Sequence, residues 1–113
     1  MMRISQGADW ARFWPLANPD GTPITDWTGW AALAQVRDTP AETSPVLWSW
    51  GTTGAPGTAS FGDGGLTLSH TAADTLDWPW RLGVWDLRVT NPAGKTALAT
   101  RGRVMVIPVV TRD

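Results

Sequence analysis

Residues 84–90 read Val-Trp-Asp-Leu-Arg-Val-Thr, and apolar and polar side chains alternate one by one from Trp85 to Thr90. A strand turns successive side chains to opposite faces, so this period of two indicates a strand with one buried face. Trp85, Leu87 and Val89 fall on the apolar face and are assigned to the core. The segment is the best-patterned strand of the chain and points to a β-protein.

Runs of the same kind lie before and after this strand. Residues 30–37 form the next clearest run, in which Trp30 and Val36 belong to the apolar row and are also assigned to the core. A long last strand is expected over 96–107, interrupted at Gly102, where a glycine is typical of a bulge or bend. The remaining expected strands are 10–16, 46–50, 58–61 and 66–68.

Two turns of the form Asn-Pro-x-Gly separate such runs, at residues 18–21 and 91–94. Asparagine is favoured at the first position of a turn, proline presets φ at the second, and glycine is favoured at the fourth. Each turn is therefore expected to be a hairpin loop. Residues 69–76 instead predict a single helical turn, because Ser69 precedes helix-tolerant residues and Pro79 follows them.

These elements predict an all-β chain with a single domain over residues 1–113. At 113 residues the chain is long enough for one domain and too short for two. About seven short strands with hairpin turns favour an immunoglobulin-like antiparallel β-sandwich with one short helical turn, and a small β-barrel is the alternative. The chain contains no cysteine, which excludes disulfides and thiolate metal sites.

The residues that could carry chemistry are few and scattered, so we expect no enzymatic activity, no cofactor and no metal site. His70 is the single histidine, and no Gly-x-Ser-x-Gly motif accompanies it. We interpret His70 as a surface or helix-start residue. Asp74 and Asp77 lie close together and Asp63 lies in a glycine-rich loop, but none has the ligand spacing of a calcium loop.

Charge and hydropathy argue against two classes of partner. The formal net charge is −1, and the nine basic residues are spread along the chain without a basic run, so no nucleic-acid partner is expected. The longest apolar run, residues 104–110, is far shorter than the roughly 20 residues that span a bilayer. We therefore expect no membrane partner either.

Tryptophan is the outlier of the composition, with nine residues beside two phenylalanines and no tyrosine. Trp48 and Trp50, and likewise Trp78 and Trp80, are spaced at i and i+2, which puts both rings of a pair on one side of an extended segment. Such a pair could stack on a sugar or anchor a protein interface. About half of the tryptophans are expected to fill the core instead.

The last strand is apolar on both faces. Val104 and Val106 continue one row, and Met105, Ile107 and Val109 form the opposite row. Successive side chains point to opposite faces, so one row must lie outside the core, at a loss of roughly 1.5–3 kcal/mol for each side chain left exposed. We therefore predict that a neighbouring subunit covers the second row. The other expected interface residues are Phe13, Trp48 and Trp50.

Several short motifs follow one another along nearly the whole chain in an order that resembles a pattern in small proteins of tailed bacteriophages and prophages. The motifs lie at residues 6–10, 20–24, 27–30, 35–37, 66–69, 71–73, 83–87 and 102–104. In their order they are similar to the immunoglobulin-like N-terminal domain of baseplate upper proteins and related minor tail proteins. This chain departs from that pattern by carrying tryptophan at several positions where Leu, Tyr or Phe is expected.

The resemblance implies a structural role in the virion, since the family has no catalytic residues to carry over. Such a subunit is expected to be a minor tail, baseplate or fibre-attachment adaptor, with a capsid decoration protein as an alternative. Its implied partners are other virion proteins and further copies of itself in the particle, which is assembled from proteins made in the bacterial cytoplasm. The tryptophan pairs leave a carbohydrate-binding module that contacts a host glycan as a second alternative.

Overall fold

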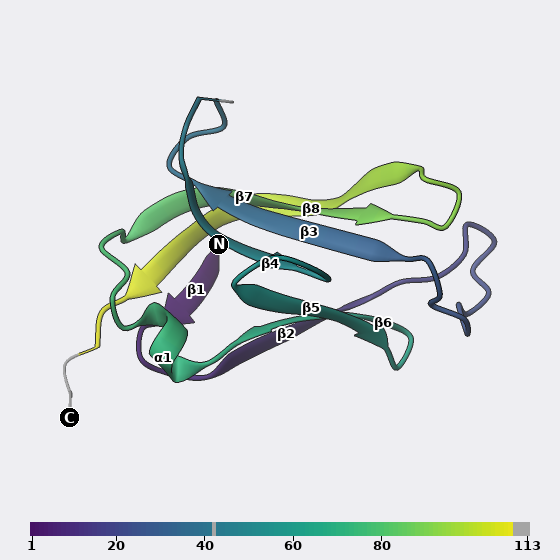
Figure 1. Cartoon of the computed structure of the whole chain (residues 1–113), viewed down its shortest axis with the longest axis horizontal. Coiled ribbons are helices and arrows are strands. Elements are labelled where there is room, and N and C mark those ends of the chain that lie inside the picture. Colours follow the sequence, from purple (N-terminus) through teal and green to yellow (C-terminus); the bar gives the residue numbers. More distant parts are fainter. Residues whose placement is uncertain (42, 110–113) are drawn as a thin grey trace.

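The computed structural model describes residues 1–41 and 43–109, and in it nearly all regular structure is β (Figure 1). A single short helix, α1, lies between the sixth and seventh strands. The strands are β1 (Met2–Ser5), β2 (Trp10–Pro15), β3 (Ala31–Arg37), β4 (Val46–Gly51), β5 (Gly57–Gly62), β6 (Gly65–His70), β7 (Leu82–Thr90) and β8 (Thr96–Ile107), and α1 covers Ala72–Thr75.

All of these strands belong to one eight-stranded sheet with the order β1-β8-β7-β3-β4-β5-β6-β2. The sheet curls, so that β3, β7 and β8 face β2, β5 and β6 across the interior (Figure 1). The two strands at the ends of this order, β1 and β2, follow each other in the chain and are joined by residues 6–9. The sheet is therefore a barrel that is nearly closed.

The expected immunoglobulin-like antiparallel sandwich is wrong, and the barrel alternative describes the fold better. In a sandwich two separate sheets pack face to face. Here β4 and β5 pair through Trp50 with Gly57 and Gly51 with Thr58, and this short parallel contact carries the sheet from one layer into the other. Because β1 also pairs with β8 in parallel, the sheet is mixed. The alternation of side chains within a strand does not predict the pairing of β4 with β5 or that of β1 with β8.

The expected helical turn is confirmed, but its start lies further along the chain. Ser69 belongs to β6, and Thr71 is the N-cap of α1. The carboxylate of Asp74 accepts hydrogen bonds from the backbone N–H of Thr71, at 2.8 Å, and from its hydroxyl, at 3.0 Å. These two bonds to Asp74 stabilise the start of a helix that is too short to be stable alone.

Both Asn-Pro-x-Gly segments are turns in which the glycine N–H donates to the asparagine C=O. The distance is 2.8 Å from Gly21 to Asn18 and 2.9 Å from Gly94 to Asn91. The second turn joins β7 to β8 as a hairpin, whereas the first closes only an isolated bridge between Ala17 and Pro23.

The expected break at Gly102 is also wrong. Strand β8 runs through Gly102, which lies directly opposite Trp85. The irregularity lies nearer the start of β8, where the partners of two successive β7 residues are Thr100 and Leu98, so that Ala99 has no partner. A side chain at position 102 would point toward the Trp85 indole. The glycine therefore adjoins a large ring rather than marking a bend.

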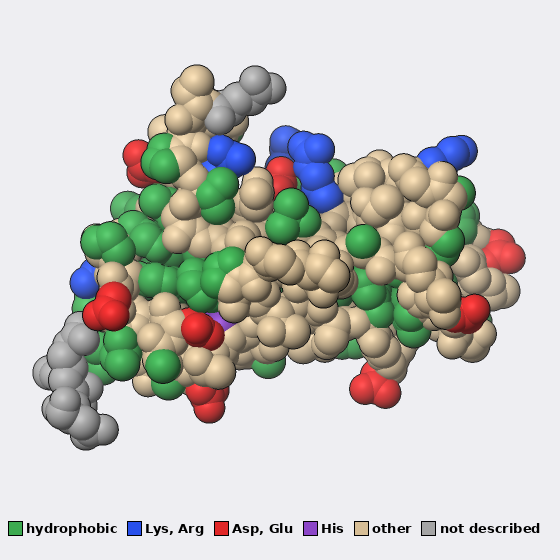
Figure 2. All heavy atoms as spheres, in the orientation of Figure 1, with side chains coloured by type: hydrophobic (Ala, Val, Ile, Leu, Met, Phe, Trp, Pro, Cys, Tyr) green, Lys and Arg blue, Asp and Glu red, His purple; other side chains and the backbone are tan. Residues whose placement is uncertain are grey.

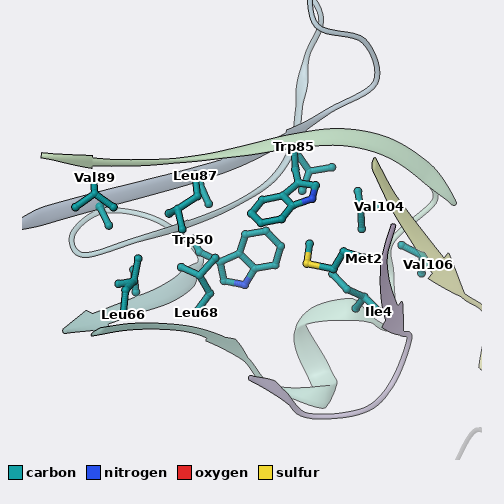
Figure 3. Packing of buried hydrophobic residues seen from close by; sticks show 14 of the residues in the cluster. Met2, Ile4, Trp50, Leu66, Leu68, Trp85, Leu87, Val89, Val104 and Val106 are labelled. Atoms are coloured by element: carbon teal, nitrogen blue, oxygen red, sulfur yellow. The ribbon is translucent and has the colours of Figure 1, made fainter. Parts of the chain in front are cut away.

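The core fills the interior of the barrel (Figure 3). Of the five residues assigned to it from the sequence, Val36, Trp85, Leu87 and Val89 are buried and Trp30 is half-buried against them. No strand was expected over residues 2–5, although Met2 and Ile4 alternate there with Arg3 and Ser5, because four residues are too few to distinguish a strand from a chance alternation. Met2 and Ile4 of β1 complete the core beside β8. The other buried apolar residues are Ile24, Ala32, Ala34, Trp50, Ala59, Leu66, Leu68, Trp78, Val104 and Val106.

Candidate functional site

An apolar row lies on the outer face of the sheet where β7 begins and β8 ends. It consists of Leu82, Met105 and Ile107, and we call these three residues the apolar row. Leu82 pairs directly with Met105, and β8 turns Val104 and Val106 inward to the core between the outward residues. Leu82 is 59% exposed, Ile107 is 43% exposed and Met105 is half-buried. Hydrophobic side chains gather at this end of the molecule, on the left in Figure 2.

Val109 does not extend this row, contrary to the sequence-based prediction. Strand β8 ends at Ile107, and Pro108 follows, which has no N–H for a further ladder bond. Val109 instead turns to the loop after β1, where its N–H donates to the side-chain carbonyl of Gln6 at 3.3 Å and its side chain adjoins Gly7. The sequence-based prediction did not include Leu82, because the alternation of apolar and polar residues in β7 becomes clear only from Trp85 onward.

Phe13 is 45% exposed on β2, which lies at the other end of the strand order from β8. Its ring lies over Gly65 of β6, where a side chain would collide with it. An aromatic ring that covers a strand glycine protects the backbone there and is a known stabilising device. Phe13 thus stabilises β6 by covering Gly65, and it lies on a different strand from the residues of the apolar row.

Trp50 is fully buried, so its assignment to an interface is wrong. Strand β4 pairs Trp50 with the buried Ala34 and Trp48 with the buried Val36, which turns both rings toward the interior. Trp48 remains half-buried, and its indole N–H is buried. Both rings therefore contribute mainly to packing.

Six rings gather at the end of the barrel near α1, and we call them the ring cluster. His70 stacks on Trp10 with 5.1 Å between ring centroids, and Trp78 stacks on Trp80 with 4.7 Å. Trp48 packs on Trp78 at 5.0 Å and so joins the two predicted pairs to each other. The members of the ring cluster are Trp10, Trp48, Trp50, His70, Trp78 and Trp80.

His70 is buried within the ring cluster, so its interpretation as a surface residue is wrong. Its Nδ1 accepts a hydrogen bond of 3.2 Å from the indole Nε1 of Trp50. Burial lowers the pKa of His70, while the charges of Asp74 and Asp9 act in the opposite direction. Within residues 1–41 and 43–109 its Nε2 is buried without a hydrogen-bond partner, as are Nε1 of Trp48 and Trp80. Only the folded chain brings these distant residues together.

The remaining tryptophans pack in two further groups. Trp27 stacks on Phe61 at 5.2 Å and meets Trp30 edge to face at 5.6 Å. Trp14 packs against Trp85 at 5.7 Å. All nine tryptophans of the chain are buried or half-buried. The pairs that could have formed a sugar platform face other rings of the same chain.

A groove lies on the same outer face as the apolar row, over β3, β7 and β8. Its volume is about 770 Å³, and residues 39–41 line it above the strands. Three guanidinium groups line it, those of Arg37, Arg88 and Arg101, together with the carboxylate of Asp86.

The candidate surfaces contain no recognisable metal centre: no three His, Cys, Asp or Glu side chains in residues 1–41 and 43–109 could jointly hold an ion. In the same residues, no helix is long and apolar enough to span a bilayer.

A scan against models of protein families finds no match, and a search of curated proteins finds none. The observations that bear on function are therefore the surface chemistry and the order of the motifs.

Proposed function

We propose that this chain is a structural subunit of a tailed bacteriophage particle, an adaptor of the tail or baseplate that acts by docking other virion proteins. The outward position of the apolar row carries the proposal. Leu82, Met105 and Ile107 are adjacent on three positions of a regular sheet face, where polar residues are the rule for a strand in contact with water. A contiguous exposed apolar surface of this kind is typical of a protein interface.

The regular backbone under the apolar row also favours docking. Met105 and Ile107 lie on β8, which pairs with β7 on one side and with β1 on the other. Their side chains are therefore held on a sheet that need not reorganise when a partner covers them, which lowers the entropic cost of association. The motif order favours a virion partner, and further copies of this chain could occupy the same particle.

A glycan-binding module and an enzyme have less support. A glycan-binding module needs exposed rings, and the pairs Trp48–Trp50 and Trp78–Trp80 pack into the ring cluster instead. An enzyme would need a base that reaches substrate, and the single histidine is 6% exposed among aromatic rings. A capsid decoration protein would use the same apolar row, and it differs from the tail adaptor only in its place in the particle.

The proposal is tested by two matched single variants on β8. Ile107→Lys adds a charge to the apolar row, and Leu98→Lys adds the same charge at the other end of the same strand, where Leu98 is 50% exposed. Both variants should fold. We expect Ile107→Lys to lose incorporation into phage particles at least about tenfold, because an unpaired charge in a covered apolar site is strongly unfavourable.

Leu98→Lys should be incorporated like the unmodified chain, as measured by immunoblotting of purified particles against a coat protein. Normal incorporation of Ile107→Lys, or equal loss for both variants, would contradict docking through the apolar row.

A further inference from the structure

The groove occupies the middle of the outer sheet face, next to the apolar row. Strand pairing sets its floor in successive rows across β3, β7 and β8. Asp86 lies between Gln35 and Arg101, and the following row places Arg88 beside Leu33. The preceding row places Val84 beside Arg37. Arginines therefore surround one carboxylate on three neighbouring strands.

Among the described residues, the positive charges of Arg88 and Arg101 in the groove are only partly neutralised. Arg88 approaches Asp86 at 3.7 Å, and both side chains are well exposed, at 65% and 40%, so this ion pair is weak. The guanidinium of Arg101 has no ion pair or side-chain hydrogen bond with any other described residue. The described lining thus holds the arginines Arg37, Arg88 and Arg101 and the carboxylate of Asp86, in a chain whose formal net charge is −1.

Arg37 shapes the groove as well as charging it. Its guanidinium donates to the backbone C=O of Ser44 and, at 3.2 Å, to the side-chain carbonyl of Gln35. These bonds tie the segment after β3 to the sheet, and residues 39–41 of that segment line the groove. The concave shape is therefore fixed before any ligand arrives.

We propose that this groove binds an acidic, extended segment of the partner protein. The proposal rests on the proposed docking function and names the chemistry of the partner. Carboxylates of the segment pair with Arg101 and Arg88, where a guanidinium can offer two parallel N–H donors to one carboxylate. Leu33 and Val84 supply apolar contacts for the side chains between them. The segment then continues along the same sheet face toward the apolar row.

The groove lining favours a peptide over a nucleic acid. A nucleic-acid strand brings one phosphate for every nucleotide and bases that stack on exposed aromatic rings. The groove has a carboxylate in its floor, and the single aromatic residue of its lining, Trp85, is buried. A peptide with spaced carboxylates can avoid Asp86 and use the apolar flanks. Its volume also falls in the range of small-ligand and peptide sites, roughly 300–1,000 Å³.

The experiment uses the full chain and a fluorescently labelled octapeptide of alternating aspartate and alanine, with binding followed by anisotropy. The matching asparagine–alanine peptide is the uncharged control. We expect the acidic peptide to bind, and its affinity to fall as the salt concentration rises, because exposed charge pairs are screened. Arg101→Gln should weaken binding about tenfold, as expected for one charge-assisted hydrogen-bonded contact. Arg12→Gln, on β2, should leave it unchanged.

A second variant separates a specific groove from general attraction. Asp86→Asn removes the carboxylate that competes for the arginines, so it should tighten peptide binding by about two- to fivefold. Equal binding of the asparagine peptide, or equal effects of Arg101→Gln and Arg12→Gln, would overturn the proposal. So would stronger binding of a deoxythymidine octanucleotide, or displacement of the peptide by an equal concentration of inorganic phosphate.

Particle incorporation distinguishes this proposal from the docking function on which it rests. If Ile107→Lys blocks incorporation and Arg101→Gln reduces it as well, both are supported. If Ile107→Lys blocks incorporation while Arg101→Gln has no effect and the acidic peptide does not bind, docking stands and the acidic segment is wrong. If neither variant changes incorporation, the docking function itself is wrong.

Discussion

The indole N–H of Trp50 donates a hydrogen bond of 3.2 Å to Nδ1 of His70 inside the ring cluster. An indole N–H is only a donor, so Nδ1 must be unprotonated, and the neutral ring carries its proton on Nε2. Protonating Nδ1 would break this bond and place a charge among aromatic rings. The contact therefore links the charge state of the single histidine to the packing of the core.

Stability should decrease when His70 becomes protonated. Burial lowers its pKa in the folded chain, so the unfolded chain binds the proton more readily. The stabilisation is complete above the unfolded pKa of about 6.5 and is lost as pH falls below it. Urea unfolding between pH 8 and pH 5 should show this loss in the unmodified chain. His70→Phe should lack it, and parallel profiles for the two chains would refute the linkage.

Replacing Trp85 by alanine should cost about 3–5 kcal/mol in the free energy of unfolding, the range for removing a buried large aromatic side chain. Trp85 is 6% exposed and packs against Trp14 on the opposite strand layer. Trp27→Ala is the control, because Trp27 is half-buried at the surface. Trp27→Ala should lower the free energy of unfolding clearly less than Trp85→Ala does. Similar midpoints for both variants in denaturant would show that Trp85 does not anchor the core.

Two glycines inside strands should respond differently to the same substitution. A Cβ at Gly65 would lie 2.2 Å from the backbone oxygen of Trp14 and 2.6 Å from the Phe13 ring, so Gly65→Ala should destabilise the chain by about 1–3 kcal/mol. At Gly102 the nearest atom is 3.6 Å away, an ordinary contact. Gly102→Ala should change stability by less than about 0.5 kcal/mol. Calorimetric melting of the two variants tests this, and a large loss at position 102 would contradict the description of β8.

The loss of stability caused by a lysine substitution in β8 should depend on whether the replaced side chain points outward or into the core. Met105→Lys together with Ile107→Lys should leave a folded monomer that has lost less than about 2 kcal/mol, because both side chains lie on the outer face. Val106→Lys should unfold the chain, since Val106 is 2% exposed in the core and a buried unpaired charge is very costly. Near-ultraviolet dichroism and sedimentation provide the measurements. An unfolded double variant would place the apolar row inside the barrel.

Local alternation was sufficient to locate most strands and to orient β7. The faces of Trp85, Leu87 and Val89 could be inferred because side-chain direction in a strand depends only on position in the chain. The same reasoning put Met105 and Ile107 on the face opposite Val104, where they lie. Turn chemistry was equally local, and the turn at residues 91–94 joins β7 to β8 as expected.

Strand pairing across long sequence distances could not be inferred in this way. The parallel contact of Trp50 with Gly57 turns two layers into one curled sheet, and no pattern in either strand encodes it. The burial of Trp50 and His70 depends on the same closure, since β4 and β6 meet only in the folded barrel. The groove is likewise a product of pairing, because Arg37, Arg88 and Arg101 come from three strands and are unremarkable one at a time. Side-chain direction is a local property of the backbone, whereas neighbours on other strands are chosen by packing of the whole chain.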